Sequence, residues 1–152
     1  RTLGVERIAG FEVEYSDEQF PTTRISSIDG SAHLTIVCYG GVLEDVEKSI
    51  ELAFDEEEII CEIICPILIN PINICPIEES VLKTQRLLII EEGSTVASFG
   101  SEVLALLHEK SIEIKRFGRL GNNELIPSSF VAEKNILPCS NSIFKSIKEL
   151  CL

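Results

Sequence analysis

The sequence predicts an α/β protein, a three-layer α/β/α sandwich in which helices cover both faces of a mostly parallel sheet. Three observations predict this fold. Residues 86–106 run from an apolar strand, through an acidic turn that contains a glycine, into an amphipathic helix, which is the βα unit of a parallel sheet. Residues 59–65, IICEIIC, are apolar nearly throughout, as in a strand covered on both faces. Expected strands and helices also alternate along the chain, so the crossovers should be right-handed.

The first expected strand covers residues 23–28 and ends at an Asp-Gly turn signal. Residues 33–39, HLTIVCY, are β-branched and apolar, and a Gly-Gly pair ends this second strand. Apolar side chains then recur at helical spacing over residues 42–54, which predicts a helix. The apolar run at residues 59–65 is the next strand.

A proline and two glutamates predict a helix over residues 76–84, because proline suits a first helical turn and acidic side chains favour its positive end. Residues 86–91 form the next expected strand. The helix expected at residues 99–110 has apolar side chains along one face and Ser98 as its predicted cap.

Residues 112–117 are expected to form the last strand, residues 118–137 a long irregular stretch, and residues 140–152 a final helix capped by its first serine. Residues 1–22 have few periodic cues, and we interpret them as a lead-in arm or the remains of an interdomain linker. Residues 23–152 are then one domain. The chain begins with arginine and contains no methionine, so we expect it to be processed or excised from a longer protein.

Composition and charge exclude several classes of protein. The chain is 45% hydrophobic, which is enough for one sizeable core, and its net charge of −12 opposes binding to nucleic acid. It contains no apolar run long enough to span a membrane and no signal peptide at its start, so a cytoplasmic protein is expected. The acidity has two interpretations, a solubilising surface or a docking face for a basic partner.

The six cysteines are predicted to be free thiols in buried or half-buried positions. Cys38, Cys61 and Cys65 fall in expected buried strands, where cysteine acts as a small hydrophobe. On one strand, Cys61 and Cys65 would lie roughly 13 Å apart at about 3.3 Å per residue. They could therefore neither bridge each other nor share a zinc ion.

No catalytic, cofactor-binding or metal-binding residue is predicted. His33 and His108 lack any metal-ligand spacing, and we interpret them as structural or surface residues. Gly40 and Gly41 separate a strand from a helix, but their surroundings match no nucleotide-binding motif. The two acidic residues of the first helical turn would also repel a phosphate group.

Four residues that form a turn at the carboxyl end of the strand at 86–91 are the candidates for contact with a partner: Glu91, Glu92, Gly93 and Ser94. They lie at the carboxyl end of a central strand, where α/β sheets place their ligand crevices. Two adjacent carboxylates could act as an acid and a base, but neighbours on an extended chain point to opposite faces. An interface-facing turn is therefore the better prediction.

The segment HLTIVCYGGVLEDVEKSIELA resembles the first βα unit of the transketolase C-terminal domain family, and VLKTQRLLIIEEGSTVASFGSEVLALL resembles its third unit. KRFGRLGNNELIPSS and NILPCSNSIFKSIKEL are similar to its late strand, loop and final helix. The resemblance covers residues 23–152. It implies a five-stranded mixed sheet in which residues 23–28 are the one antiparallel strand.

The resemblance implies a C-terminal, non-catalytic dimerisation and partner-docking domain, most like that of a 2-oxoacid dehydrogenase E1 β subunit. The parent enzyme would decarboxylate a 2-oxo acid and transfer the acyl group to lipoamide, with thiamine diphosphate and Mg²⁺ bound by its other domains. The Gly-Asp-Gly and Asn-Asn signature for that cofactor is missing here, so no cofactor is expected in this chain.

The implied partners are the rest of its own enzyme, as a homodimer or as two α and two β subunits, and a basic segment of the E2 acyltransferase. A transketolase or deoxyxylulose-phosphate synthase parent is the first alternative. A stand-alone binding module is the second.

Overall fold

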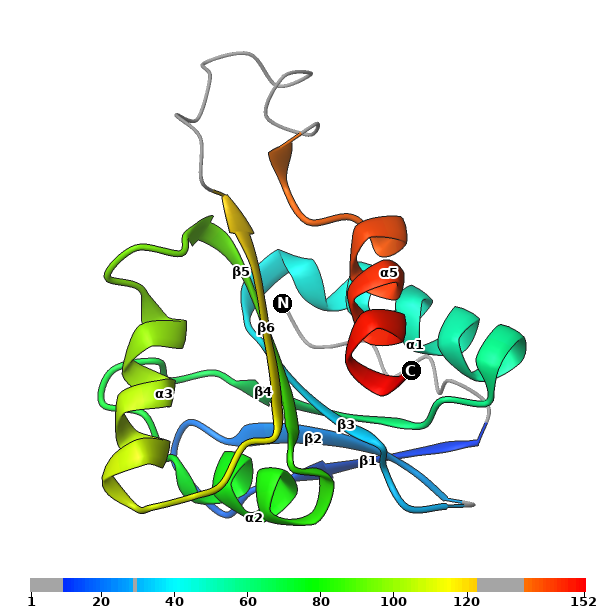
Figure 1. Ribbon diagram of the computed structural model, residues 1–152. Coiled ribbons are helices and arrows are strands. Elements are labelled where there is room, and N and C mark those ends of the chain that lie inside the picture. Colours follow the sequence, from blue (N-terminus) through cyan, green and yellow to red (C-terminus); the bar gives the residue numbers. More distant parts are fainter. Residues whose placement is uncertain (1–9, 29, 123–135) are drawn as a thin grey trace.

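The computed structural model describes residues 10–28, 30–122 and 136–152. They contain six strands and five helical segments (Figure 1). In chain order they are β1 (Phe11–Tyr15), β2 (Thr22–Ser27), β3 (Leu34–Cys38), the short 3₁₀ helix η1 (Gly40–Val42), α1 (Leu43–Glu57), β4 (Cys61–Pro66), α2 (Cys75–Thr84), β5 (Arg86–Ser94), α3 (Phe99–Glu109), β6 (Arg116–Asn122) and α5 (Ser140–Cys151).

The strands form one sheet in the order β1-β2-β4-β3-β5-β6. The last four of these strands are mutually parallel, whereas β2 pairs antiparallel with β4 and β1 pairs antiparallel with β2. Helices α1 and α5 cover one face, and α2 and α3 cover the other (Figure 1). The predicted α/β/α sandwich is confirmed, and so is the antiparallel strand expected at residues 23–28.

The sheet has six strands rather than the expected five, because residues 11–15 form β1. From the sequence, with its few periodic cues, these residues are expected to belong to a lead-in arm or to the remains of an interdomain linker. Phe11 is buried while Glu12 and Glu14 are exposed, which is the alternation of a half-covered strand. Five residues of this kind are a weak signal on their own, and pairing with β2 supplies the hydrogen bonds that stabilise the strand.

The last strand was predicted at residues 112–117, but β6 runs from Arg116 to Asn122. Gly118 and Gly121 made this stretch look irregular, since glycine weakens a strand interior. In the structure, Gly118 permits a close approach: a Cβ at this position would lie 3.1 Å from Leu150 and 3.2 Å from Leu88. The rest of the expected irregular stretch, residues 123–135, lies outside the described residues.

Neither of the two serines predicted to cap a helix makes a capping hydrogen bond with its side chain. Ser98 precedes α3 but makes no capping hydrogen bond with its side chain. Helix α5 is capped by Cys139 rather than by Ser140, with reciprocal bonds between Cys139 and Ser142. Among the described residues, no helix is long and apolar enough to cross a membrane.

The cysteines are free thiols in the structure, but two are more exposed than predicted. Cys38, Cys61 and Cys65 are buried in strands, as expected, and Cys151 is half-buried. Cys75 and Cys139 are exposed, because each lies where a loop enters a helix rather than on its packed face.

Candidate functional site

The carboxyl end of β5 carries a buried carboxylate that anchors the following turn. Glu91 is fully buried. Its Oε1 accepts a hydrogen bond from the backbone N–H of Gly100 at 3.1 Å, and its Oε2 accepts one from the Ser98 hydroxyl at 2.8 Å. The Arg119 guanidinium of β6 lies 3.4 Å from Oε2 and also donates to the Ser98 hydroxyl and to the Thr95 carbonyl. The carboxylate therefore joins β5, the start of α3 and β6.

This burial changes the assignment of the four docking candidates. Glu91 does not present its carboxylate to solvent, so it is withdrawn as a contact for a partner and becomes the internal support of the turn. Glu92 and Ser94 are exposed and Gly93 is half-buried, so these three remain at the surface. The expectation that the two adjacent carboxylates point to opposite faces of the sheet agrees with their positions, since Glu91 faces α3 and Glu92 faces η1.

The Glu92 carboxylate lies over the start of η1. A Cβ added at Gly41 would lie only 2.6 Å from Glu92 Oε1, and Gly40 has a φ of +73° that favours glycine. The glycine pair therefore makes room for a carboxylate of the protein itself. A phosphate group at this helix start would meet that negative charge.

Tyr39 lies near both carboxylates and packs against the start of α3. Its ring contacts the Phe99 ring edge-on, with centroids 5.1 Å apart. Burial raises the pKa of the Tyr39 phenol, and the negative charges of Glu91 and Glu92 raise it further. The carboxyl edge of β3 and β5 is therefore acidic and partly desolvated.

These residues do not fit thiamine diphosphate or Mg²⁺. Glu92 opposes a diphosphate at η1, and the described ranges contain no group of three His, Cys, Asp or Glu side chains that could hold a metal ion. His33 has a structural contact, since its Nδ1 accepts a hydrogen bond from the Ile60 N–H at 3.0 Å, and His108 is exposed near the end of α3.

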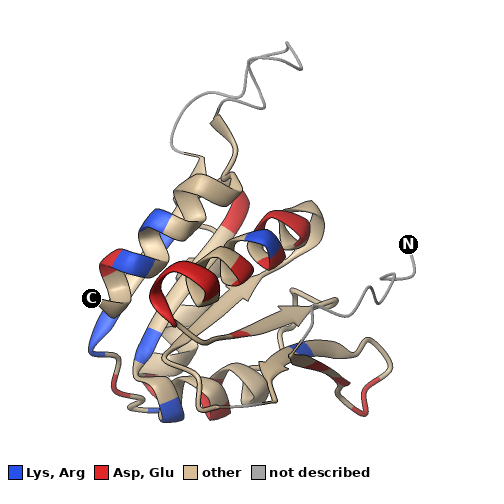
Figure 2. Cartoon of the chain, turned by 90° about the vertical axis from the view of Figure 1, so that its right-hand side faces the viewer, with Lys and Arg blue, Asp and Glu red and all other residues tan. Residues whose placement is uncertain are grey.

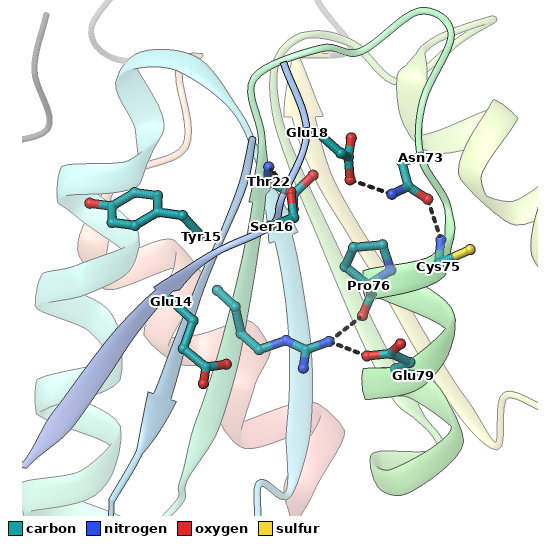
Figure 3. A pocket seen from close by; sticks show the side chains of 10 residues that line it. Glu14, Tyr15, Ser16, Glu18, Thr22, Asn73, Cys75, Pro76 and Glu79 are labelled. Atoms are coloured by element: carbon teal, nitrogen blue, oxygen red, sulfur yellow. Dashed lines mark hydrogen bonds and ion pairs between the residues drawn. The ribbon is translucent and has the colours of Figure 1, made fainter. Parts of the chain in front are cut away.

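A second polar feature, which no sequence motif indicates, is a pocket of about 300 Å³ at the β1–β2 edge of the sheet. Figure 3 shows its side chains, which come from the β1–β2 hairpin and the start of α2. Arg24 donates to the Pro76 carbonyl at 3.2 Å and to Glu79 at 2.8 Å, while Asn73 donates to Glu18. These bonds join the hairpin to the loop and first turns of α2. No local sequence motif indicates them, because the bonded residues are about 50 positions apart.

Exposed apolar side chains lie on the two segments that these bonds join. Phe20 is in the β1–β2 turn, and Ile67, Leu68 and Ile69 are in the loop after β4. The pairing of Thr22 with Pro66 brings the turn and the loop to the same end of the sheet. Apolar side chains gathered in this way are typical of a surface that contacts another protein.

Acidic residues are concentrated on α1, which follows η1. The helix contains seven of the chain's 25 acidic residues and one lysine. Figure 2 shows them beside the lysines of α5, and Lys148 of α5 pairs with Glu57 of α1. Glu92 therefore lies at the end of an extended acidic surface that Lys48 of α1 and the lysines of α5 partly neutralise.

The chain matches the family model for the transketolase C-terminal domain over residues 26–138. Its curated relatives include the pyruvate dehydrogenase E1 component subunit beta of Rickettsia bellii, which is 27% identical over 93% of this chain and 44% of the relative. The same subunit of Staphylococcus aureus is 29% identical over 76% of this chain and 36% of the relative. The chain thus spans less than half the length of these relatives.

Among solved structures, a split-gene transketolase described as an inactive β4 tetramer superposes with a TM-score of 0.71 at 18% identity, over 84% of this chain and 42% of that one. A 2-oxoglutarate:ferredoxin oxidoreductase from Magnetococcus marinus superposes with a TM-score of 0.57 at 12% identity, over 93% of this chain and 20% of that one. At these identities the superpositions support the fold alone.

Proposed function

The chain belongs to the transketolase C-terminal domain family, and from that membership we propose that it is the non-catalytic dimerisation and partner-docking domain of an E1 β subunit. The parent would be a thiamine diphosphate-dependent 2-oxoacid dehydrogenase that decarboxylates a 2-oxo acid and transfers the acyl group to lipoamide. The curated relatives support this parent, because both are E1 β subunits of pyruvate dehydrogenase. Residues 23–152 are proposed as the domain, with β1 packed onto its edge, in a cytoplasmic enzyme.

The observation that carries the docking role is the acidic carboxyl end of β5. Glu91 is bonded to α3 and β6, while Glu92 and Ser94 remain exposed. We infer that these bonds hold the end of the strand in place, which reduces the entropic cost of ordering it when a partner binds. The net charge of −12 favours a basic partner, and a basic segment of the E2 acyltransferase is the proposed one.

Binding to a lysine- and arginine-rich E2 segment, measured by stopped flow over a range of salt concentrations, tests this proposal. The association rate should fall steeply as salt is added, because charge steers the encounter. Glu92→Gln should reduce the rate most at low ionic strength. Glu102→Gln, an exposed glutamate in the first turn of α3, is the matched control for net charge. A rate that does not depend on salt, or equal rates for the two variants, would refute the docking role of this end of β5.

The proposed dimerisation is supported by the exposed apolar side chains at the end of β4, which a subunit contact would remove from water. The proposed parent binds thiamine diphosphate and Mg²⁺ through residues outside this chain. Calorimetry with both should therefore give no saturable heat. A micromolar dissociation constant would show that this chain contains cofactor-binding residues, and would contradict the proposal that the cofactor is bound elsewhere in the parent enzyme.

The alternative parents are distinguished by the coding sequence upstream of residue 1. A single long chain with the Gly-Asp-Gly and Asn-Asn signature indicates a transketolase or a deoxyxylulose-phosphate synthase. A preceding domain without it indicates an E1 β subunit. An open reading frame that begins near residue 1 indicates a stand-alone binding module.

A further inference from the structure

Two buried thiols face each other across the centre of the sheet. β3 and β4 are parallel neighbours with Ile36 opposite Ile63 and Val37 opposite Ile64, so Cys38 and Cys65 occupy the next rung. Both belong to the core beneath α1 and α5, so their side chains point to the same face of the sheet. Their thiols are close enough for each to shift the pKa of the other.

The backbone geometry suits a covalent link. Adjacent strands lie about 4.8 Å apart. Disulfides form between residues whose Cα atoms are about 4.4–6.8 Å apart. At the spacing of neighbouring strands Cys38 and Cys65 fall within this range, and their side chains leave the same face of the sheet side by side, so rotation of the two side chains is what brings the sulfur atoms together.

The two thiols are chemically different. A hydrogen bond from Cys38 lowers the pKa of Cys65, whereas the same bond, together with burial, raises the pKa of Cys38. Cys65 also retains 7% of its surface exposed, while Cys38 has none. Because the thiolate is the nucleophile, Cys65 is the thiol that a small oxidant reaches and reacts with first.

We propose that Cys38 and Cys65 form an oxidation site that closes to an intrachain disulfide when the protein meets a peroxide. The Cys65 thiolate attacks one peroxide oxygen, the O–O bond breaks, and the departing oxygen takes a proton to become water. The Cys65 sulfenic acid is then attacked by the Cys38 sulfur. The S–O bond breaks, and the hydroxyl leaves as water with the Cys38 proton. Two thiols are oxidised and one peroxide is reduced to two waters.

The remaining core cysteines provide an internal comparison. Cys61 lies on the same strand and the same face as Cys65, but its partner on β3 is Leu34. Burial raises the pKa of its thiol strongly, and the nearby Cys151 raises it further. Cys61 should therefore stay reduced under conditions that link Cys38 to Cys65.

The test uses the full chain with Cys75→Ser and Cys139→Ser, which remove the two exposed thiols and leave four. The reduced protein is treated with hydrogen peroxide and alkylated in denaturant, and the remaining thiols are counted by intact mass. Two of the four should be lost, and dithiothreitol should restore them. Cleavage after Glu62 separates Cys61 from Cys65, so the linked peptides identify the pair.

Cys61→Ser in the same background should still lose two thiols, and Cys65→Ser should lose the cross-link. Peptide mapping of the unvaried core decides the question even if a core variant fails to fold. Four surviving thiols, a link between Cys61 and Cys151, or a Cys65 sulfinic acid without a cross-link would each overturn the proposal.

Discussion

Replacing Glu91 by glutamine should destabilise the fold far more than the same change at the adjacent Glu92. Both oxygens of the buried Glu91 carboxylate accept hydrogen bonds, one from the Gly100 N–H and the other from the Ser98 hydroxyl and Arg119. A glutamine has one acceptor and one donor in the same places. Its NH₂ group must therefore face either the Gly100 N–H or the donors around Ser98, whichever way the amide is oriented.

The expected cost follows from these contacts. A buried donor left without an acceptor costs about 1–3 kcal/mol. Loss of the negative charge also removes the partner of Arg119 and the favourable interaction with the N-terminus of α3, which contributes about 0.3–2 kcal/mol. The Arg119 side chain is 21% exposed, so water offsets part of the lost ion pair. We expect Glu91→Gln to lower the free energy of unfolding by about 2–4 kcal/mol.

Urea unfolding followed by far-ultraviolet circular dichroism measures this change. With a typical slope of about 2 kcal/mol per molar, the midpoint should fall by about 1–2 M. Glu92→Gln should change the unfolding free energy by less than about 0.5 kcal/mol, because its carboxylate is exposed. Equal midpoints for the two variants would refute the reasoning. So would a double-mutant cycle with Arg119→Met that gives no coupling between positions 91 and 119.

Three further predictions concern other parts of the chain. In a Tyr15→Phe background, ultraviolet titration should show the Tyr39 pKa above its ordinary value, and Glu92→Gln should lower it by removing a nearby negative charge. Since the folded state raises this pKa, the associated stability is complete below the ordinary tyrosine value of about 10 and is lost as pH rises through the folded value. Cys139 should be the first thiol alkylated by iodoacetamide at neutral pH, because backbone and hydroxyl hydrogen bonds from Ser142 at the start of α5 lower its pKa; peptide mapping at short times checks this. Gly118→Ala should destabilise the fold by about 1–3 kcal/mol, because its methyl group would crowd the buried Leu88 and Leu150. Calorimetry should therefore show a lower thermal midpoint, whereas an unchanged midpoint would show that α5 moves to make room for the methyl group.

Local sequence pattern is enough to predict the fold class, most of the helices and the strands at the centre of the sheet. These elements are long or strongly apolar, so their burial follows from local pattern: residues 59–65 and 86–91 have no polar face to expose. It also predicted that Glu91 and Glu92 point to opposite faces, because alternation along an extended chain is a local property.

Which of the two carboxylates is buried depends on the packing of β5 against β6 and α3. Glu91 is the buried one because Arg119 of β6 and Gly100 of α3 bind its carboxylate, and no local sequence pattern indicates these partners. The same reason explains why β1 and β6 were missed or displaced, since short or glycine-containing strands are stabilised by pairing with a neighbour rather than by their own composition. The Cys38–Cys65 contact likewise exists only because register sets two residues 27 positions apart on one rung. Local sequence pattern controls which segments are buried, whereas the meeting of distant side chains is controlled by topology and register.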